Sequence, residues 1–117
     1  MGLSTHVLDT MHGCPAAGMQ VELYAMHGNS ATLVKRLTLN ADGRTAGGPL
    51  YGDGELEQGT YRLVFGVAAY FKGKGVTLPE PNFLGRVTLD FGISNPEQHY
   101  HVPLLVSPWA YSTYRGS

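Results

Sequence analysis

Short runs in which apolar and polar residues alternate recur along the chain and predict β-strands. In residues 3–9 this alternation places Ser4, His6 and Leu8 on one face of the first predicted strand. Six further runs have the same two-residue spacing: 19–25, 33–39, 61–67, 87–91, 99–106 and 111–115. The pattern therefore predicts seven or eight short strands.

Glycine and proline separate these runs, and the 117 residues include 16 glycines and 7 prolines. The stretch Gly13-Cys14-Pro15 is expected to end the first strand, and Pro103 is expected at a sheet edge or a bulge because proline has no N–H for a ladder. Residues 68–74 are the one run that fits a helix, of barely two turns. We therefore expect an all-β sandwich with one short helix, forming a single domain over residues 1–117.

Net charge, hydropathy and the N-terminal residues argue against several function classes. Eight Lys and Arg residues against nine Asp and Glu residues give a net charge of −1, which argues against a nucleic-acid surface. No apolar run approaches the roughly 20 residues needed to span a bilayer, so no membrane partner is expected. The N-terminal segment has neither the basic start nor the apolar stretch of a secretory signal, and the single Cys14 cannot close an intramolecular disulfide. Both features favour a cytoplasmic location.

The histidines carry the first candidate chemistry. His99 and His101 are two residues apart, so they share a face of one predicted strand, and His6 lies on the Ser4 face of the first strand. Imidazole exchanges a proton near neutral pH without large tuning, so clustered imidazoles indicate acid–base chemistry or a metal. A single strand histidine is more often a surface or hydrogen-bonded residue, and His12 and His27 are interpreted as surface residues.

A metal site is the less favoured of these interpretations. His6, His99 and His101 could form a three-imidazole zinc site, because two histidines separated by one residue supply two ligands from one face. No third ligand has local support in the sequence, and no carboxylate is placed to orient the rings. We therefore predict no metal.

Arg44 follows the strongest turn signal of the chain, the segment Asn40-Ala41-Asp42-Gly43. An arginine at a strand start is most often solvated. In a site, its guanidinium would donate two parallel hydrogen bonds to a planar, oxygen-rich ligand. The residues alone leave both interpretations open.

Five segments of the chain resemble the transthyretin-like family. Its opening is matched by LSTHVLDT at 3–10 with GCPA at 13–16, and its middle motif by DGR at 42–44. The segments HYHVPLL at 99–105 and YSTYRGS at 111–117 resemble the signature of its enzymatic branch, the 5-hydroxyisourate hydrolases. The tetrapeptide at 114–117 is the most specific of these motifs.

The resemblance implies a sandwich of two four-stranded sheets with a short helix after the fifth strand. It implies a homotetramer around a central channel, with substrate sites at the dimer–dimer interface. The implied reaction is hydrolysis of the small molecule 5-hydroxyisourate to 2-oxo-4-hydroxy-4-carboxy-5-ureidoimidazoline in urate degradation, with no metal or organic cofactor.

The resemblance also assigns site residues. His6, Arg44, His101 and Ser117 are expected to be catalytic. Substrate is expected to contact four side chains: His6, Arg44, His99 and Tyr114. Two alternatives remain open at this stage, a non-catalytic carrier like the hormone-transporting branch of the family and a purely structural sandwich module, because a fold does not decide a function.

Overall fold

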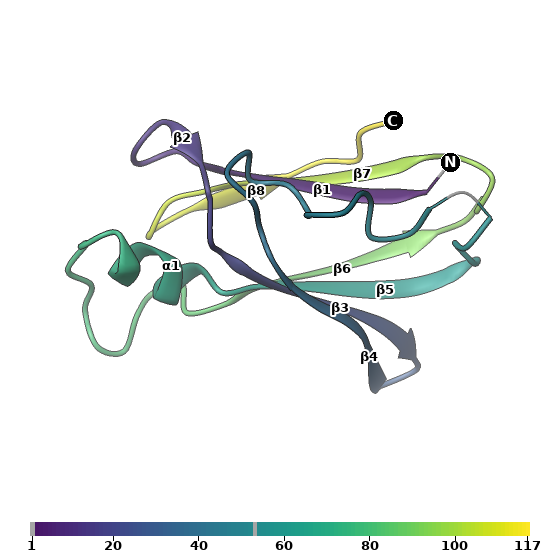
Figure 1. Cartoon of the computed structure of the whole chain (residues 1–117). Coiled ribbons are helices and arrows are strands. Elements are labelled where there is room, and N and C mark those ends of the chain that lie inside the picture. Colours follow the sequence, from purple (N-terminus) through teal and green to yellow (C-terminus); the bar gives the residue numbers. More distant parts are fainter. Residues whose placement is uncertain (1, 53) are drawn as a thin grey trace.

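The computed structural model describes residues 2–52 and 54–117, which form two layers of strands with a short helix at one end (Figure 1). The elements of this described part are, in chain order, β1 (Leu3–Asp9), β2 (Cys14–Pro15), β3 (Gln20–His27), β4 (Ser30–Thr38), β5 (Gly59–Phe65), α1 (Val67–Gly73), β6 (Val87–Ile93), β7 (Tyr100–Val106) and β8 (Tyr111–Thr113). The predicted strands and the predicted helix are thus all present, and no predicted end differs from the observed one by more than three residues.

The strands form two four-stranded sheets, in the orders β2-β1-β7-β8 and β4-β3-β5-β6. β1 and β7 pair in parallel, although they stand at opposite ends of the sequence, and the other pairs are antiparallel. This arrangement confirms the predicted sandwich of two four-stranded sheets with one short helix.

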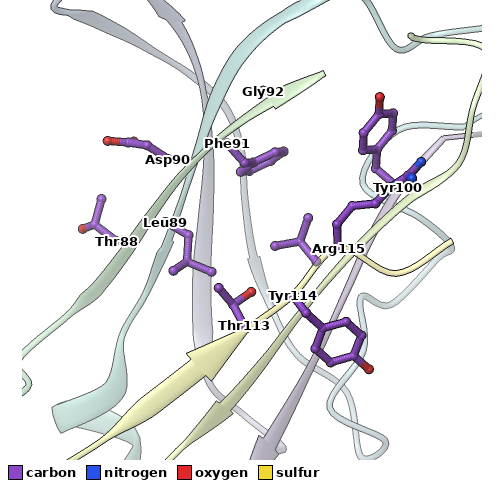
Figure 2. A pocket seen from close by; sticks show the side chains of 10 residues that line it. Thr88, Leu89, Asp90, Phe91, Gly92, Tyr100, Thr113, Tyr114 and Arg115 are labelled. Atoms are coloured by element: carbon purple, nitrogen blue, oxygen red, sulfur yellow. The ribbon is translucent and has the colours of Figure 1, made fainter. Parts of the chain in front are cut away.

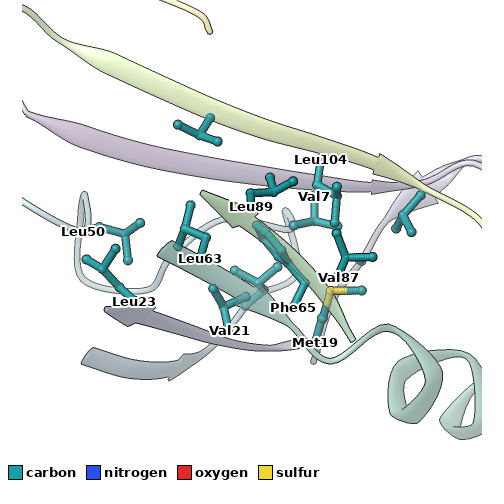
Figure 3. Packing of buried hydrophobic residues seen from close by; sticks show 14 of the residues in the cluster. Val7, Met19, Val21, Leu23, Leu50, Leu63, Phe65, Val87, Leu89 and Leu104 are labelled. Carbon is teal, nitrogen blue, oxygen red and sulfur yellow. The ribbon is translucent and has the colours of Figure 1, made fainter. Parts of the chain in front are cut away.

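Alternation along the strands builds the core between the sheets. In β1 every second residue is buried, and Leu3 and Val7 have no exposed surface. Figure 3 shows Val7 and Leu104 of one sheet packing toward Leu63 and Phe65 of the other. Burying one face of β1 in this way leaves its other face, which carries Ser4 and His6, on the outside of the sandwich.

Helix α1 closes one end of the core. Its buried residues are Val67, Ala68, Tyr70 and Phe71. Within residues 2–52 and 54–117, no helix combines the length and the apolar character needed to cross a bilayer.

One local expectation is incomplete and another is wrong. Cys14 and Pro15 do not simply break the first strand: they form the short strand β2, which turns back and pairs with Leu8 and Asp9 of β1. Pro103 is not at a sheet edge, because it lies inside β7, between β1 and β8. The reason that the sheet tolerates this proline lies in the C-terminal segment, described below.

Candidate active site

The outer face of β1 carries the first two polar side chains of the site. Ser4 and His6 alternate with the buried residues of β1 and are half-buried. The parallel register places Ser4 opposite His101 and His6 opposite Pro103 of β7. His6 and His101 therefore lie on neighbouring strands and on the same face of the sheet.

Arg44 reaches the free edge of β1 through a tight turn. Gly43 has φ +72°, and its carbonyl oxygen accepts a hydrogen bond from Val7 N at 2.9 Å. A Cβ at this position would lie 2.5 Å from Val7 O, so only glycine permits this approach. The side chain of Asn40 accepts hydrogen bonds from the backbone of the turn, including Arg44 N at 3.1 Å. An antiparallel bridge then pairs Arg44 with His6.

The chain end forms the opposite side of the site. Gly116 and His101 exchange two backbone hydrogen bonds, of 3.1 and 2.6 Å. The same register places Pro103 opposite Tyr114. A non-proline residue at position 103 would donate a backbone hydrogen bond to this partner, and proline has no N–H to do so. Strand β8 ends before Tyr114, and the hydroxyl of Thr113 donates to Pro103 O at 2.7 Å. Pro103 is therefore compatible with an interior strand because the regular ladder stops beside it.

Tyr114 and Arg115 point to opposite sides of the chain end. Figure 2 shows Arg115 reaching toward Tyr100, while the ring of Tyr114 points away from Tyr100. The Arg115 guanidinium lies 4.3 Å from the centre of the Tyr100 ring and donates to His99 O at 3.1 Å. Tyr114 is 61% exposed, and the final residue Ser117 is exposed as well. The tail thus holds the backbone before β7 in place and leaves the Tyr114 side chain exposed.

His99 joins the cluster through Ser4. It lies one residue before the start of β7, so the strand predicted over 99–106 is one residue too long. Ser4 Oγ is 3.0 Å from His99 Nε2 and 2.8 Å from His101 Nδ1. Sequence reasoning placed Ser4 on the correct face but did not select it as a site residue. The signal that could have found it is its position two residues before His6, on the same strand face.

The surroundings of both central imidazoles favour the neutral form. Burial lowers the pKa of His6, and the positive charge of Arg44 lowers it further, while the backbone and the carboxylate of Asp42 partly offset these effects. Burial also lowers the pKa of His101, with further contributions from Arg44, His6 and His99. Neutral imidazoles beside a permanent cation can accept a proton from water.

A groove next to the chain end is lined by Tyr114 and Arg115 but contains none of the histidines of the site. It has a volume of about 450 Å³ and lies between the edge strand β6 and the chain end (Figure 2). Its lining is largely apolar and includes Leu89, Phe91 and Val102. The histidine cluster lies instead on the open outer face of the sheet β2-β1-β7-β8, where a single chain provides no opposite wall.

Sequence reasoning also missed one role of a histidine. His12 is not simply a surface residue, because its Nδ1 lies 2.6 Å from the buried carboxylate of Asp9. Tyr70 of α1 donates to the same carboxylate at 2.8 Å. This cluster joins β1 to the helix at the far end of the strand from Ser4. Among the residues that the structure describes, no group of three His, Cys, Asp or Glu side chains is arranged to hold a metal.

Comparison with known proteins gives matches over nearly the whole chain. The family model described as HIUase/Transthyretin family matches residues 3–116. A 5-hydroxyisourate hydrolase of Deinococcus radiodurans is 53% identical over 116 residues, which cover 99% of this chain and 96% of that protein. A 5-hydroxyisourate hydrolase of Pseudomonas aeruginosa is 50% identical over 115 residues, which cover 98% of this chain and 90% of that protein.

Solved structures share the fold. A crystal structure of (S)-allantoin synthase has a TM-score of 0.92 and 48% identity, and the match covers 99% of this chain but 43% of that longer chain. Klebsiella pneumoniae 5-hydroxyisourate hydrolase has a TM-score of 0.77 and 34% identity, with both chains fully covered. Sea bream transthyretin in complex with thyroxine has a TM-score of 0.84 and 25% identity, covering 99% of this chain and 95% of that one. The match over residues 3–116 and the hydrolase relatives at about half identity place this chain in the HIUase/Transthyretin family.

Proposed function

We infer that this chain is a 5-hydroxyisourate hydrolase, which opens its substrate to 2-oxo-4-hydroxy-4-carboxy-5-ureidoimidazoline in urate degradation. The curated relatives at about 50% identity over nearly the whole chain carry that name. The observation that supports the inference most strongly is the placement of His6, Arg44 and His101 side by side on one sheet face. An imidazole can act as a base, and a guanidinium can stabilise an oxyanion, in the hydrolysis of an oxygen-rich cyclic amide.

The reaction adds water across an acyl–nitrogen bond. The water oxygen bonds to the carbonyl carbon and loses a proton, the carbon–nitrogen bond breaks, and the leaving nitrogen gains a proton. In the proposed mechanism His6 and His101 divide these proton transfers, and the lowered pKa of each ring favours the neutral form that accepts the proton of water. A well-placed proton transfer contributes about 10²- to 10⁴-fold to such a reaction.

Arg44 provides the electrostatic part of this proposal. Its side chain is exposed beside His6, where a guanidinium can anchor the substrate's oxygens through two parallel hydrogen bonds. The same charge stabilises the oxyanion that forms as water attacks. A single oxyanion donor of this kind contributes about 3–4 kcal/mol to lowering the barrier.

The C-terminal tail, residues 114–117, completes the proposed site. Gly116 holds the tail against His101, and the exposed Tyr114 is proposed to orient substrate. Ser117 follows Gly116 directly, so its hydroxyl is proposed to act beside His101 in catalysis. His99 is proposed to contribute through Ser4, as argued below.

The proposed assembly is a homotetramer with sites at the dimer–dimer interface. The outer face of the sheet that bears His6 and His101 is open in one chain, so a second copy would supply the wall that encloses a substrate. Exclusion of bulk water strengthens the interaction of Arg44 with developing charge.

A carrier function is less well supported. The structural relative with bound thyroxine is 25% identical, about half the identity of the hydrolase relatives. A carrier also has no chemical need for two neutral imidazoles beside an arginine.

The direct test is to add the protein to freshly oxidised urate and to follow the absorbance of 5-hydroxyisourate. The expected result is decay much faster than the spontaneous reaction, with the ureidoimidazoline as the product. A decay rate equal to that of the protein-free control would contradict the proposed function.

A further inference from the structure

The hydroxyl of Ser4 connects two imidazoles that belong to different positions of the chain. Its oxygen is 3.0 Å from His99 Nε2 and 2.8 Å from His101 Nδ1. A serine hydroxyl has one hydrogen, so when both contacts are hydrogen bonds it donates to one ring and accepts from the other. The protonation of His99 Nε2 and that of His101 Nδ1 are therefore linked through Ser4.

Because Ser4 occupies Nδ1, the nitrogen of His101 that remains for a reacting molecule is Nε2. The Cδ2 atom bonded to Nε2 lies beside the tail, where a Cβ on Gly116 would come within 3.2 Å of it. When Nδ1 carries the proton, Nε2 of the neutral ring has a free lone pair and can act as a base.

A lasting positive charge on His101 is unfavourable at this position. Burial and the neighbouring Arg44, His6 and His99 all lower the pKa of its ring. Histidine bases in many hydrolases are stabilised by a carboxylate behind Nδ1. In this chain the group at Nδ1 is the Ser4 hydroxyl, and the next group beyond it is His99.

We propose that Ser4 and His99 form a proton relay behind His101, with Ser4 as a positioning residue and His99 as the terminal acceptor. The proposal rests on the proposed hydrolase function. When water attacks, its proton bonds to His101 Nε2, while the Nδ1 proton of His101 moves to Ser4 Oγ. The original hydroxyl proton of Ser4 moves to His99 Nε2. Ser4 and His101 end the step neutral, and the positive charge is on His99.

The structure holds His99 in place for this role from two sides. Ser4 contacts the ring, and the Arg115 guanidinium contacts the carbonyl oxygen of His99 at 3.1 Å. Arg115 is itself stacked on Tyr100. His99 is only half-buried, so a proton that it receives can pass to solvent before the next turnover.

The test compares Ser4→Ala, Ser4→Thr and His99→Gln in steady-state hydrolysis of 5-hydroxyisourate. Ser4→Ala removes the hydroxyl and Ser4→Thr retains it. Glutamine at position 99 can still hydrogen-bond to Ser4 but cannot take a proton. The matched control is His27→Gln, since His27 is an exposed histidine at the end of β3.

We expect Ser4→Ala and His99→Gln each to lower kcat by about tenfold or more and to change KM by less than about threefold. Ser4→Thr should restore most of kcat, and His27→Gln should match the wild type. The double variant Ser4→Ala/His99→Gln should be no slower than the slower single variant, because both changes interrupt one relay.

Rates in mixtures of H₂O and D₂O provide a readout that a structural role would not change. Wild-type kcat should depend non-linearly on the deuterium fraction, because several protons move together, and the dependence should become linear in both Ser4→Ala and His99→Gln. If Ser4→Ala does not fold, the same comparison with His99→Gln decides the question.

Two results would overturn the relay while leaving the hydrolase function intact: an unchanged kcat in folded Ser4→Ala or in His99→Gln, or a non-linear deuterium dependence that persists in these variants. A wild-type protein that does not accelerate substrate decay would instead reject the proposed function, and the relay with it.

Discussion

Burial and the charge of Arg44 favour the neutral form of each of the two central imidazoles. Both have a pKa below the ordinary histidine value of about 6.5. A base must be unprotonated, so the lowered pKa extends the active range to more acidic pH than an exposed histidine would allow.

This gives a prediction for pH titration. By NMR, the ring protons of His6 and His101 should titrate below about 6.5, and the acid limb of kcat/KM should lie in the same region. Replacing Arg44 with Gln removes the nearby positive charge, so both pKa values should rise. Unchanged pKa values of both rings in Arg44→Gln would mean that the charge of Arg44 does not influence their protonation.

The shape of the Arg44 side chain gives a second residue-scale prediction. Arg44→Lys keeps the charge but loses the planar pair of donors. We expect kcat/KM for 5-hydroxyisourate to fall by about tenfold or more, as for the loss of a charge-assisted hydrogen bond.

The matched control for this prediction is Arg86→Lys, because the Arg86 side chain is 71% exposed and Arg86 directly precedes β6 of the other sheet. Arg86→Lys should retain full activity. A fully active Arg44→Lys variant would count against anchoring of the substrate by two parallel hydrogen bonds.

At the scale of elements, four neighbouring segments bring the site together: the turn at 40–44, β1, β7 and the tail at 114–117. Gly43 and Gly116 permit the two outer contacts, because each approaches a neighbouring strand more closely than another residue could without displacement. The side chains of the site are therefore positioned by backbone pairing along a single sheet.

Gly116→Ala tests the pairing of the tail. An alanine Cβ would lie 3.1 Å from Cβ and 3.2 Å from Cδ2 of His101, so the tail or the ring must move. We expect kcat to fall by about tenfold, while the melting temperature changes little because the tail lies outside the core. The control is Gly92→Ala in β6, where an added Cβ meets nothing within 4 Å. Equal activity of the two variants would show that tail position is unimportant.

Much of this element-level arrangement could be predicted from the sequence. Alternation alone placed Ser4 and His6 on the outer face of β1, and the turn residues before Arg44 were correctly interpreted. The parallel pairing of β1 with β7 could not be derived from spacing, because it joins residues 97 apart, such as Ser4 and His101. For this reason the contact of Ser4 with both histidines was missed, and Pro103 was expected at an edge.

At the scale of the whole molecule, the outer site depends on a sandwich in which the last residue of β1, Asp9, is hydrogen-bonded to helix α1. The carboxylate of Asp9 has no exposed side-chain surface and accepts hydrogen bonds from His12 and from Tyr70 of α1. Burial alone would raise the pKa of Asp9, but the hydrogen bonds from His12 and Tyr70 outweigh it and lower the pKa. The charged form of Asp9 therefore stabilises the fold.

Asp9→Asn should lower the free energy of unfolding by roughly 2 kcal/mol, as for the loss of hydrogen bonds to a charged group. In the wild type this stabilisation is complete above the unfolded-state pKa of about 3.9 and is lost as the pH falls through the lower folded value. Chemical denaturation at several pH values measures both effects. Asp90→Asn is the control, because Asp90 forms an exposed pair with Arg62 and should contribute much less. Equal losses in the two variants would contradict a structural role for Asp9.

The central claim is that imidazoles from the two ends of the chain act together on one substrate. It is tested most directly by the initial rate of 5-hydroxyisourate decay for the wild type, His6→Ala, His101→Ala and the double variant, with the oligomeric state checked in each. We predict at least a tenfold loss of rate in each folded single variant. The double variant should retain a rate well above the value expected if the two losses multiplied, since both histidines act in one site. Wild-type rates in both single variants would contradict the account.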